Sequence, residues 1–115
     1  GVKGIAAGTA HSAFVTHDGR AYSVGWNNRG QLGDGTRTSR RYPVLVKSGV
    51  RRVAAGAAHT VFLLDDANGT AYASGANSNG QLGDGSLTDR EVPVLVETGV
   101  QSVVAGIAQT LFLKV

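Results

Sequence analysis

Residues 30–35 read Gly-Gln-Leu-Gly-Asp-Gly, and residues 80–85 read the same six residues again. The identity extends outward on both sides of this stretch. When residues 1–48 are aligned with residues 49–98 across one two-residue gap, 26 of the 48 positions are identical. Residues 99–115 restart the unit and stop after its first third. Self-similarity with a period of about fifty residues predicts a repeat architecture in which neighbouring copies stack on one another.

Short apolar and β-branched runs within each unit predict strands, and no window shows a helical period of useful length. The second strand of each unit is apolar on both alternating faces, which is typical of a strand buried on both sides. The last strand carries Pro43 or Pro93, which cannot donate to a ladder and therefore indicates a sheet edge. The expected strands are Val2–Ala7, His11–Thr16, Arg20–Val24 and Tyr42–Val46, then Val50–Ala55, His59–Leu64, Thr70–Ser74 and Val92–Val96, then Val100–Ala105 and Gln109–Lys114.

Tight turns join these strands. Asp18-Gly19 and Asn68-Gly69 both accept the positive φ values of a two-residue hairpin turn, so we expect a hairpin at each. Four strands and one long loop per unit is what one propeller blade needs. The fold class is therefore expected to be all-β, with four-stranded antiparallel blades forming a partial propeller. Two and a third units cannot close a propeller ring, so the open ends are expected to expose apolar surface that invites self-association.

Several stretches resemble the repeat of the regulator of chromosome condensation family across the whole chain. They are VAAGxAHT (Val53–Thr60), the Asp-Gly or Asn-Gly turn, AYxxG (Ala21–Gly25 and Ala71–Gly75), NxxGQLGDG (Asn27–Gly35 and Asn77–Gly85) and Pro-Val (Pro43–Val44 and Pro93–Val94). The resemblance implies blades of a seven-bladed propeller. In the usual frame of that family, residues 1–17 would be the tail of one repeat, and 18–65 and 66–115 would be two complete repeats of a single repeat domain.

The repeated positions are expected to serve the fold. His11 and His59 occupy the same place in successive units, whereas a catalytic histidine is usually unique, so we expect each ring to bond to a backbone group of the neighbouring loop. Gln109, which also donates and accepts, takes this place in the third unit. The expected structural positions are Gly8, His11, Gly25, Asn27, Gly30, Gln31, Leu32, Gly33, Gly56, His59, Gly75, Asn77, Gly80, Gln81, Leu82, Gly83 and Gly106.

No motif predicts catalysis, a cofactor or a metal. The Gly-Gln-Leu-Gly-Asp-Gly run lacks the Lys-Ser/Thr ending of a phosphate-binding loop, and a turn capped by the side chain of Asp34 or Asp84 is the better interpretation. The spacing does not match a calcium-binding EF-hand. The chain contains no Cys, which excludes disulfides and thiol catalysis. It begins with Gly1 and contains no Met, which predicts a piece of a longer protein, and no apolar run is long enough to span a membrane. The sequence does not indicate a compartment.

Charge and loop variation point to a binding role. Residues 1–48 carry a net charge of +5 and residues 49–98 a net charge of −3. This inversion argues against a uniform polyanion as the ligand and for a shaped protein partner. We therefore predict a non-catalytic protein-binding scaffold, and the resemblance to the regulator of chromosome condensation family implies a regulatory role of the nucleotide-exchange or inhibitor kind. Chromatin or nucleic-acid binding through the basic first loop is the alternative. The candidate partner-binding residues are Trp26, Arg29, Arg37, Arg40 and Arg41.

Overall fold

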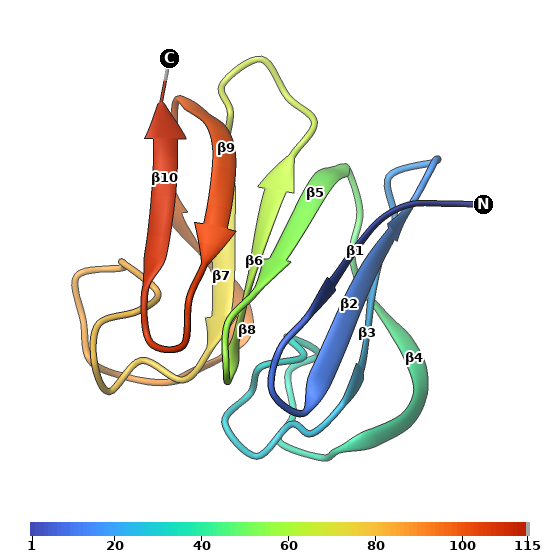
Figure 1. The fold of residues 1–115 in the computed structure, drawn as a ribbon, viewed down its shortest axis with the longest axis vertical. Coiled ribbons are helices and arrows are strands. Elements are labelled where there is room, and N and C mark those ends of the chain that lie inside the picture. Colours follow the sequence, from blue (N-terminus) through green and yellow to red (C-terminus); the bar gives the residue numbers. More distant parts are fainter. Residues whose placement is uncertain (115) are drawn as a thin grey trace.

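The computed structural model describes residues 1–114, and it confirms the all-β class: these residues form ten strands and no helix (Figure 1). The strands are β1 (Val2–Ala7), β2 (His11–Thr16), β3 (Ala21–Gly25), β4 (Arg40–Lys47), β5 (Val50–Ala55), β6 (His59–Leu64), β7 (Ala71–Gly75), β8 (Arg90–Glu97), β9 (Val100–Ala105) and β10 (Thr110–Lys114).

The strands form three antiparallel sheets, each a propeller blade or part of one. Blade 1 has the order β1-β2-β3-β4, blade 2 has the order β5-β6-β7-β8, and the half-blade contains β9 and β10. Blade 1 and the half-blade lie on opposite sides of blade 2 (Figure 1). β4 and β8 are edge strands, as their prolines predict, and they begin two residues earlier than expected because Arg40 and Arg90 pair with Gly25 and Gly75.

The hairpin turns differ from the expectation in one respect. Of the two turn residues, only the glycine has a positive φ: 83° at Gly19 and 60° at Gly69, and no described residue other than glycine does. Asp18 and Asn68 therefore keep ordinary backbone conformations. The turns are longer than two residues, since the backbone N–H of Thr16 donates to the carbonyl of Arg20 at 3.0 Å. The chain can thus reverse with a single left-handed residue, and a glycine supplies it without steric cost.

The core lies between the blades. Val15 and Ala21 of blade 1 pack with Val50 and Phe62 of blade 2, and all four are fully buried. β6 is buried on both faces, as the sequence predicts, because blade 2 has neighbours on both sides. β2 alternates instead between buried and more exposed residues, because blade 1 has a neighbour on one side. Burial of each blade therefore depends on the next one in the stack.

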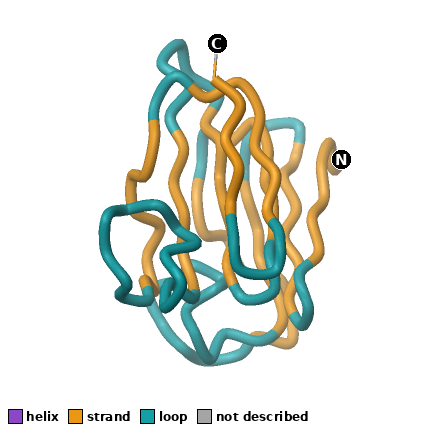
Figure 2. Tube along the Cα trace, turned by 60° about the vertical axis from the view of Figure 1, so that its left-hand side comes forward, coloured by secondary structure: helices purple, strands orange, loops and turns teal. Residues whose placement is uncertain are grey.

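Two long connections complete the blades. Loop 1 (residues 26–39) joins β3 to β4, and loop 2 (residues 76–89) joins β7 to β8. Both loops lie at the same end of the sheets (Figure 2). Loop 1 reaches blade 2, because a Cβ built on Gly30 would lie 2.7 Å from the carbonyl oxygen of Arg90. Loop 1 is therefore a junction element as well as a connection.

Candidate partner-binding surface

A buried asparagine organises each long loop. Asn27 is fully buried, and its Oδ1 accepts a hydrogen bond from the backbone N–H of Leu32 at 2.9 Å. Its Nδ2 lies 3.0 Å from Asp34 Oδ1 and 2.9 Å from the carbonyl oxygen of Thr36. Asn77 makes the equivalent contacts in loop 2. Because one amide satisfies several buried groups, the loop keeps a fixed shape despite its lack of regular structure.

The aspartate of the shared motif caps its turn and also forms an ion pair. Asp34 Oδ1 accepts from the backbone N–H of Thr36 at 3.0 Å, as the sequence predicts, and Asp34 Oδ2 accepts from Arg40 Nε at 2.9 Å. Burial opposes ionisation of Asp34, but the hydrogen bonds from Thr36 and Arg40 outweigh it and lower the carboxyl pKa. Asp84 and Arg90 repeat the pair at 2.8 Å. Arg40 thus holds loop 1 together.

His11 and His59 join the blades. His11 Nε2 lies 2.8 Å from Thr60 Oγ1 of blade 2, and this hydroxyl donates to the carbonyl oxygen of Gln31 in loop 1 at 2.6 Å. The contact repeats one unit later between His59 Nε2 and Thr110 Oγ1, at 3.0 Å. The sequence predicted a backbone partner for the His11 ring. The ring bonds instead to the hydroxyl of Thr60, and this hydroxyl bonds to the backbone of Gln31. A strand side chain bridges the gap that separates one blade from the next.

This arrangement fixes the tautomer of each ring. Because Thr60 Oγ1 donates its only hydrogen to the carbonyl of Gln31, it accepts from His11, so His11 Nε2 carries the hydrogen. His11 Nδ1 and His59 Nδ1 are buried without a hydrogen-bond partner. Adding a proton there would create a buried N–H with no acceptor. Burial accordingly lowers the pKa of His11 from 6.5 to about 4, and it also lowers the pKa of His59.

Ion pairs join loop 1 to loop 2 and to the start of β8, and they use the opposite charges of the two units. Arg29 of loop 1 donates to both carboxylate oxygens of Asp89 in loop 2, at 2.6 Å and 3.1 Å. Arg37 Nε donates to Glu91 Oε1 at 3.2 Å. The hydrogen bond from Arg29 is the main cause of the lowered pKa of Asp89. The basic residues of the first unit and the acidic residues of the second therefore attract one another inside the chain. The opposite charges do not require a shaped partner as their explanation.

The five candidate partner-binding residues thus have different surroundings. Arg29, Arg37 and Arg40 form ion pairs within the chain, at 37%, 44% and 36% side-chain exposure. Among residues 1–114, Trp26 and Arg41 form no ion pair or side-chain hydrogen bond, and both are exposed. Tyr42, which the sequence did not single out, is 80% exposed beside Arg41.

Trp26 is exposed at a place that is covered in blade 2. Its counterpart Ala76 is 3% exposed, whereas Trp26 is 60% exposed. In blade 2 the neighbouring Gly75 lies against loop 1, since a Cβ there would be 3.0 Å from Gln31 Cα. At Gly25, by contrast, the three nearest atoms to an added Cβ belong to Ala10 and His11 of the same blade. Gly25, the residue before Trp26, pairs with Arg40 across the β3–β4 ladder. Trp26, Arg41 and Tyr42 therefore lie at one end of that ladder, and we call them the rim patch.

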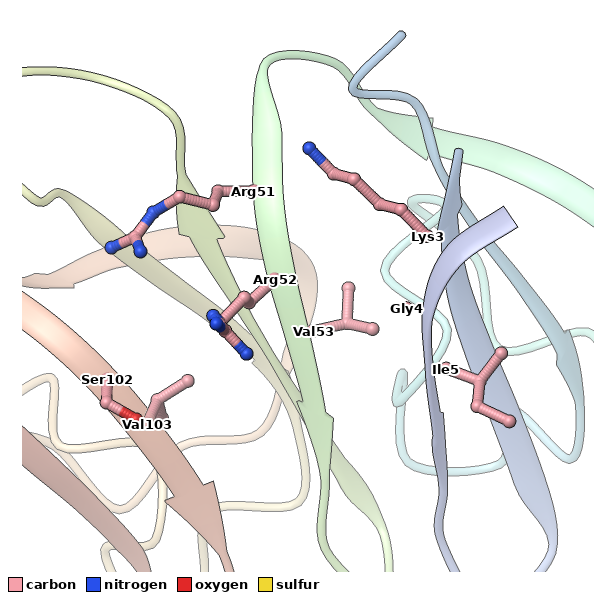
Figure 3. A pocket seen from close by; sticks show the side chains of 8 residues that line it. All are labelled: Lys3, Gly4, Ile5, Arg51, Arg52, Val53, Ser102 and Val103. Carbon is pink, nitrogen blue, oxygen red and sulfur yellow. The ribbon is translucent and has the colours of Figure 1, made fainter. Parts of the chain in front are cut away.

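A second polar surface escaped the sequence reasoning. The first strands of the three sheets line a groove of about 330 Å³, into which Lys3, Arg51 and Arg52 bring cationic side chains (Figure 3). None of the residues that line the groove is acidic, and Arg51 donates to the carbonyl oxygen of Gln101 at 3.1 Å. Lys3 and Arg51 occupy the same position in units 1 and 2, and Arg52 follows Arg51. The positive charge shared at this position is the sequence signal that could have indicated the groove.

Residues 1–114 contain no group of three His, Cys, Asp or Glu side chains that could hold a metal ion. In the same part of the chain, no helix is long and apolar enough to cross a membrane.

Comparisons with known proteins agree with this architecture. A family model of the regulator of chromosome condensation (RCC1) repeat matches residues 18–63 and 68–113, and a second model of this repeat matches residues 2–31 and 50–81. Human E3 ubiquitin-protein ligase HERC2 is 46% identical over 61 residues, which cover 50% of this chain and 1% of that protein. The ultraviolet-B receptor UVR8 of Arabidopsis thaliana is 44% identical over 64 residues, 52% of this chain and 14% of the receptor. The chain thus spans a small part of these relatives.

Solved structures share the fold along almost the whole chain. Human WBSCR16 superposes with a TM-score of 0.86 at 23% identity, covering 98% of this chain and 31% of that one. Prp20p of Saccharomyces cerevisiae, described together with its binding properties to Gsp1p and histones, gives 0.84 at 25% identity, covering 100% of this chain and 32% of that one. The chain spans about a third of each of these propellers.

Proposed function

Because this chain belongs to the regulator of chromosome condensation (RCC1) repeat family, we propose that it is a non-catalytic protein-binding scaffold whose partner contacts the rim patch. The observation that carries the proposal is the exposure of Trp26, Arg41 and Tyr42 at one end of the β3–β4 ladder, 60% for Trp26 and 80% for Tyr42. Tryptophan, tyrosine and arginine are the residue types that most often dominate the energetics of protein interfaces.

Two further observations support a binding role without catalysis. His11 and His59 are each committed to a junction between blades, with one ring nitrogen bonded to a threonine and the other buried. Prp20p, the similar structure described with its binding properties to Gsp1p and histones, offers a precedent for protein binding on this fold. We further propose that the scaffold regulates its partner, as an exchange factor or an inhibitor does.

Nucleic-acid binding through loop 1 is the alternative, and the ion pairs disfavour it. Arg29, Arg37 and Arg40 are each within 3.2 Å of a carboxylate oxygen. A phosphate would have to compete with these carboxylates for the three arginines. Arg41 is the one candidate arginine that could bind a phosphate without breaking an ion pair. Binding to duplex DNA that weakens steeply with added salt would favour the alternative.

The test measures the binding of two purified probes, Gsp1p and histone octamers, to the immobilised chain. Trp26→Ala is expected to weaken binding of the recognised probe about tenfold or more, the effect of losing an interface anchor. Arg41→Glu is expected to slow association, because exposed charges mainly steer the encounter. Arg20→Glu is the matched control, since Arg20 is similarly exposed but lies before β3 whereas Trp26 follows it.

Either of two results would refute the proposal. One is the absence of binding to both probes. The other is a Trp26→Ala and an Arg41→Glu variant that bind as tightly and as fast as the Arg20→Glu control. In that case the binding surface would lie outside the rim patch.

A further inference from the structure

The first strand of each unit carries a β-bulge at the same place. In β1 the extra residue is Lys3, in β5 it is Arg51, and in β9 it is Gln101, since the register of each ladder skips this residue. A bulge leaves one residue out of the ladder, bends the strand and re-aims its side chains, and bulges recur beside functional sites. In units 1 and 2 the residue at the bulge is a cation.

The bulge in β5 brings two neighbouring cations to one groove. Successive side chains of a regular strand point to opposite faces. Arg51 and Arg52 are adjacent in the sequence, yet both line the groove of about 330 Å³ between β1, β5 and β9. Figure 3 shows both side chains pointing from β5 toward β9, and Lys3 extending from β1 toward β5. The groove therefore receives positive charge from two strands that belong to successive units.

No carboxylate of residues 1–114 pairs with Lys3, Arg51 or Arg52. Six other basic side chains in this part of the chain do form ion pairs, namely Arg20, Arg29, Arg37, Arg40, Arg90 and Lys114. Arg51 Nη2 donates to the carbonyl oxygen of Gln101 at 3.1 Å, a contact that uses one of the five N–H groups of its guanidinium. Like charges gathered around one groove repel one another, so an anion bound between them would lower the energy of the folded chain.

The groups that line the groove suit phosphate. A guanidinium presents its N–H groups in a planar fork that matches two phosphate oxygens, and an ammonium binds phosphate as a point charge. Gly4 and Ser102, the counterparts of Arg52 in the other two units, are small and leave the groove open. Ser102 also adds a hydroxyl donor on β9, toward which Arg52 points (Figure 3). The cations are spread over β1 and β5, which fits a chain of phosphates better than a single phosphate.

We propose that this groove binds a small anion that carries a chain of two or more phosphate groups, held by Lys3, Arg51 and Arg52. A volume of about 330 Å³ lies at the lower end of the range of small-ligand pockets, so the groove admits a short phosphate chain. An acidic peptide fits less well, because each of its carboxylates brings a single charge together with a backbone that needs room. The site does not depend on the proposed function, since β1 and β4 are opposite edges of blade 1 and the rim patch lies beside β4.

The test is isothermal titration calorimetry of the chain with inorganic triphosphate, in a buffer without divalent cations, which would neutralise the probe. The wild-type chain is expected to bind triphosphate about tenfold more tightly than inorganic monophosphate, because the longer anion meets more of the cations. Arg52→Gln is expected to weaken triphosphate binding about tenfold, and Arg52→Lys to weaken it less, because lysine keeps the charge and loses the fork. Ser102→Asp should abolish binding, since it places a carboxylate where Arg52 points. Arg20→Gln is the matched control, because it removes an exposed arginine outside the groove.

Thermal unfolding gives a second readout, because a ligand that binds only the folded chain raises its Tm. Arg52 is exposed, so Arg52→Gln should unfold like the wild type without the probe and gain less Tm when the probe is added.

Titrations with adenosine triphosphate and with a short polyglutamate peptide identify the source of the anion. An affinity for adenosine triphosphate no higher than that for triphosphate assigns the groove to a free phosphate chain. A higher affinity assigns it to a nucleotide whose organic part contacts the apolar lining residues Ile5, Val53 and Val103. Three results would overturn the proposal: no binding of triphosphate at about millimolar concentration, equal weakening by Arg20→Gln and Arg52→Gln, or tighter binding of the polyglutamate peptide than of triphosphate.

Discussion

Gly56 is the position where a single added methyl group should report most sharply on the junction between blades. A Cβ at Gly56 would overlap the ring of His59 and the carbonyl oxygen of Gly106 in the half-blade. The neighbouring carbonyl belongs to backbone, which cannot move aside as the end of a side chain can. Gly106 is the equivalent position one unit later, and there the added atom would meet only Gln109, with its nearest atom 2.9 Å away. The two glycines therefore form a matched pair.

The expected magnitudes follow from these surroundings. Forcing a methyl group into a packed site costs about 1–3 kcal/mol, and displacing His59 from Thr110 costs about 1 kcal/mol more. The reduced entropy of the unfolded chain returns about 0.4–1 kcal/mol. We expect Gly56→Ala to lower the free energy of unfolding by about 2 kcal/mol, which is about 8 °C in Tm for a domain of this size. Gly106→Ala should change it by less than about 0.5 kcal/mol, because the exposed Gln109 side chain can rotate away.

The assay is urea unfolding followed by circular dichroism, at protein concentrations low enough for the chain to be monomeric. Equal losses of unfolding free energy in Gly56→Ala and Gly106→Ala would refute the reasoning. They would show that the cost comes from replacing a glycine and not from the contact of Gly56 with the half-blade.

Three other perturbations test the remaining contacts. Folded His11 stays neutral down to about pH 4 while unfolded histidine takes up a proton near pH 6.5, so stability should fall by up to about 3 kcal/mol as pH drops through this interval, and His11→Gln should remove that fall in acid titrations of the unfolding free energy. His59→Ala is expected to lower stability by about 1–3 kcal/mol because Thr110 loses its partner, and a loss of some specific activity at unchanged stability would contradict the structural role. A double-mutant cycle of Arg29→Ala and Asp89→Ala should give a coupling energy of about 1 kcal/mol that shrinks with added salt, whereas no coupling would mean that the bidentate pair is not formed in solution.

The strands could be predicted from the sequence because their signals are local. Apolar runs, glycine-bearing turns and an edge proline each act within a few residues. A signal that occurs in both units is stronger evidence for a strand or turn than the same signal in one unit. The hairpin turns were predicted less well, because Asp18 and Asn68 tolerate a positive φ but the longer turn does not require one of them. A residue that merely tolerates a positive φ predicts a turn type less well than a position that requires one.

The junction contacts could not be predicted in the same way, because they join residues about fifty to sixty positions apart. Nothing local distinguishes Arg29, which pairs with Asp89, from Arg41, which is exposed without an ion pair. One signal was nevertheless available for Arg40. It is identical in both units, as Arg90, whereas the other three loop arginines are replaced. Identity between units indicated a role in the fold, and the structure gives Arg40 that role through Asp34.

The residues that differ between the units carry a further consequence for the order of the blades. Loop 1 supplies the cations Arg29 and Arg37, and the following unit supplies the acids Asp89 and Glu91. If the units were exchanged, Asn79 and Leu87 would face Ser39 and Arg41, and neither ion pair could form. The identical framework positions alone would let either unit follow the other. The unlike charges therefore favour one order over the other, although exposed pairs contribute only about 0.2–1 kcal/mol each. In a fold built from near-identical units, such small differences are what distinguishes the intended neighbour from the wrong one.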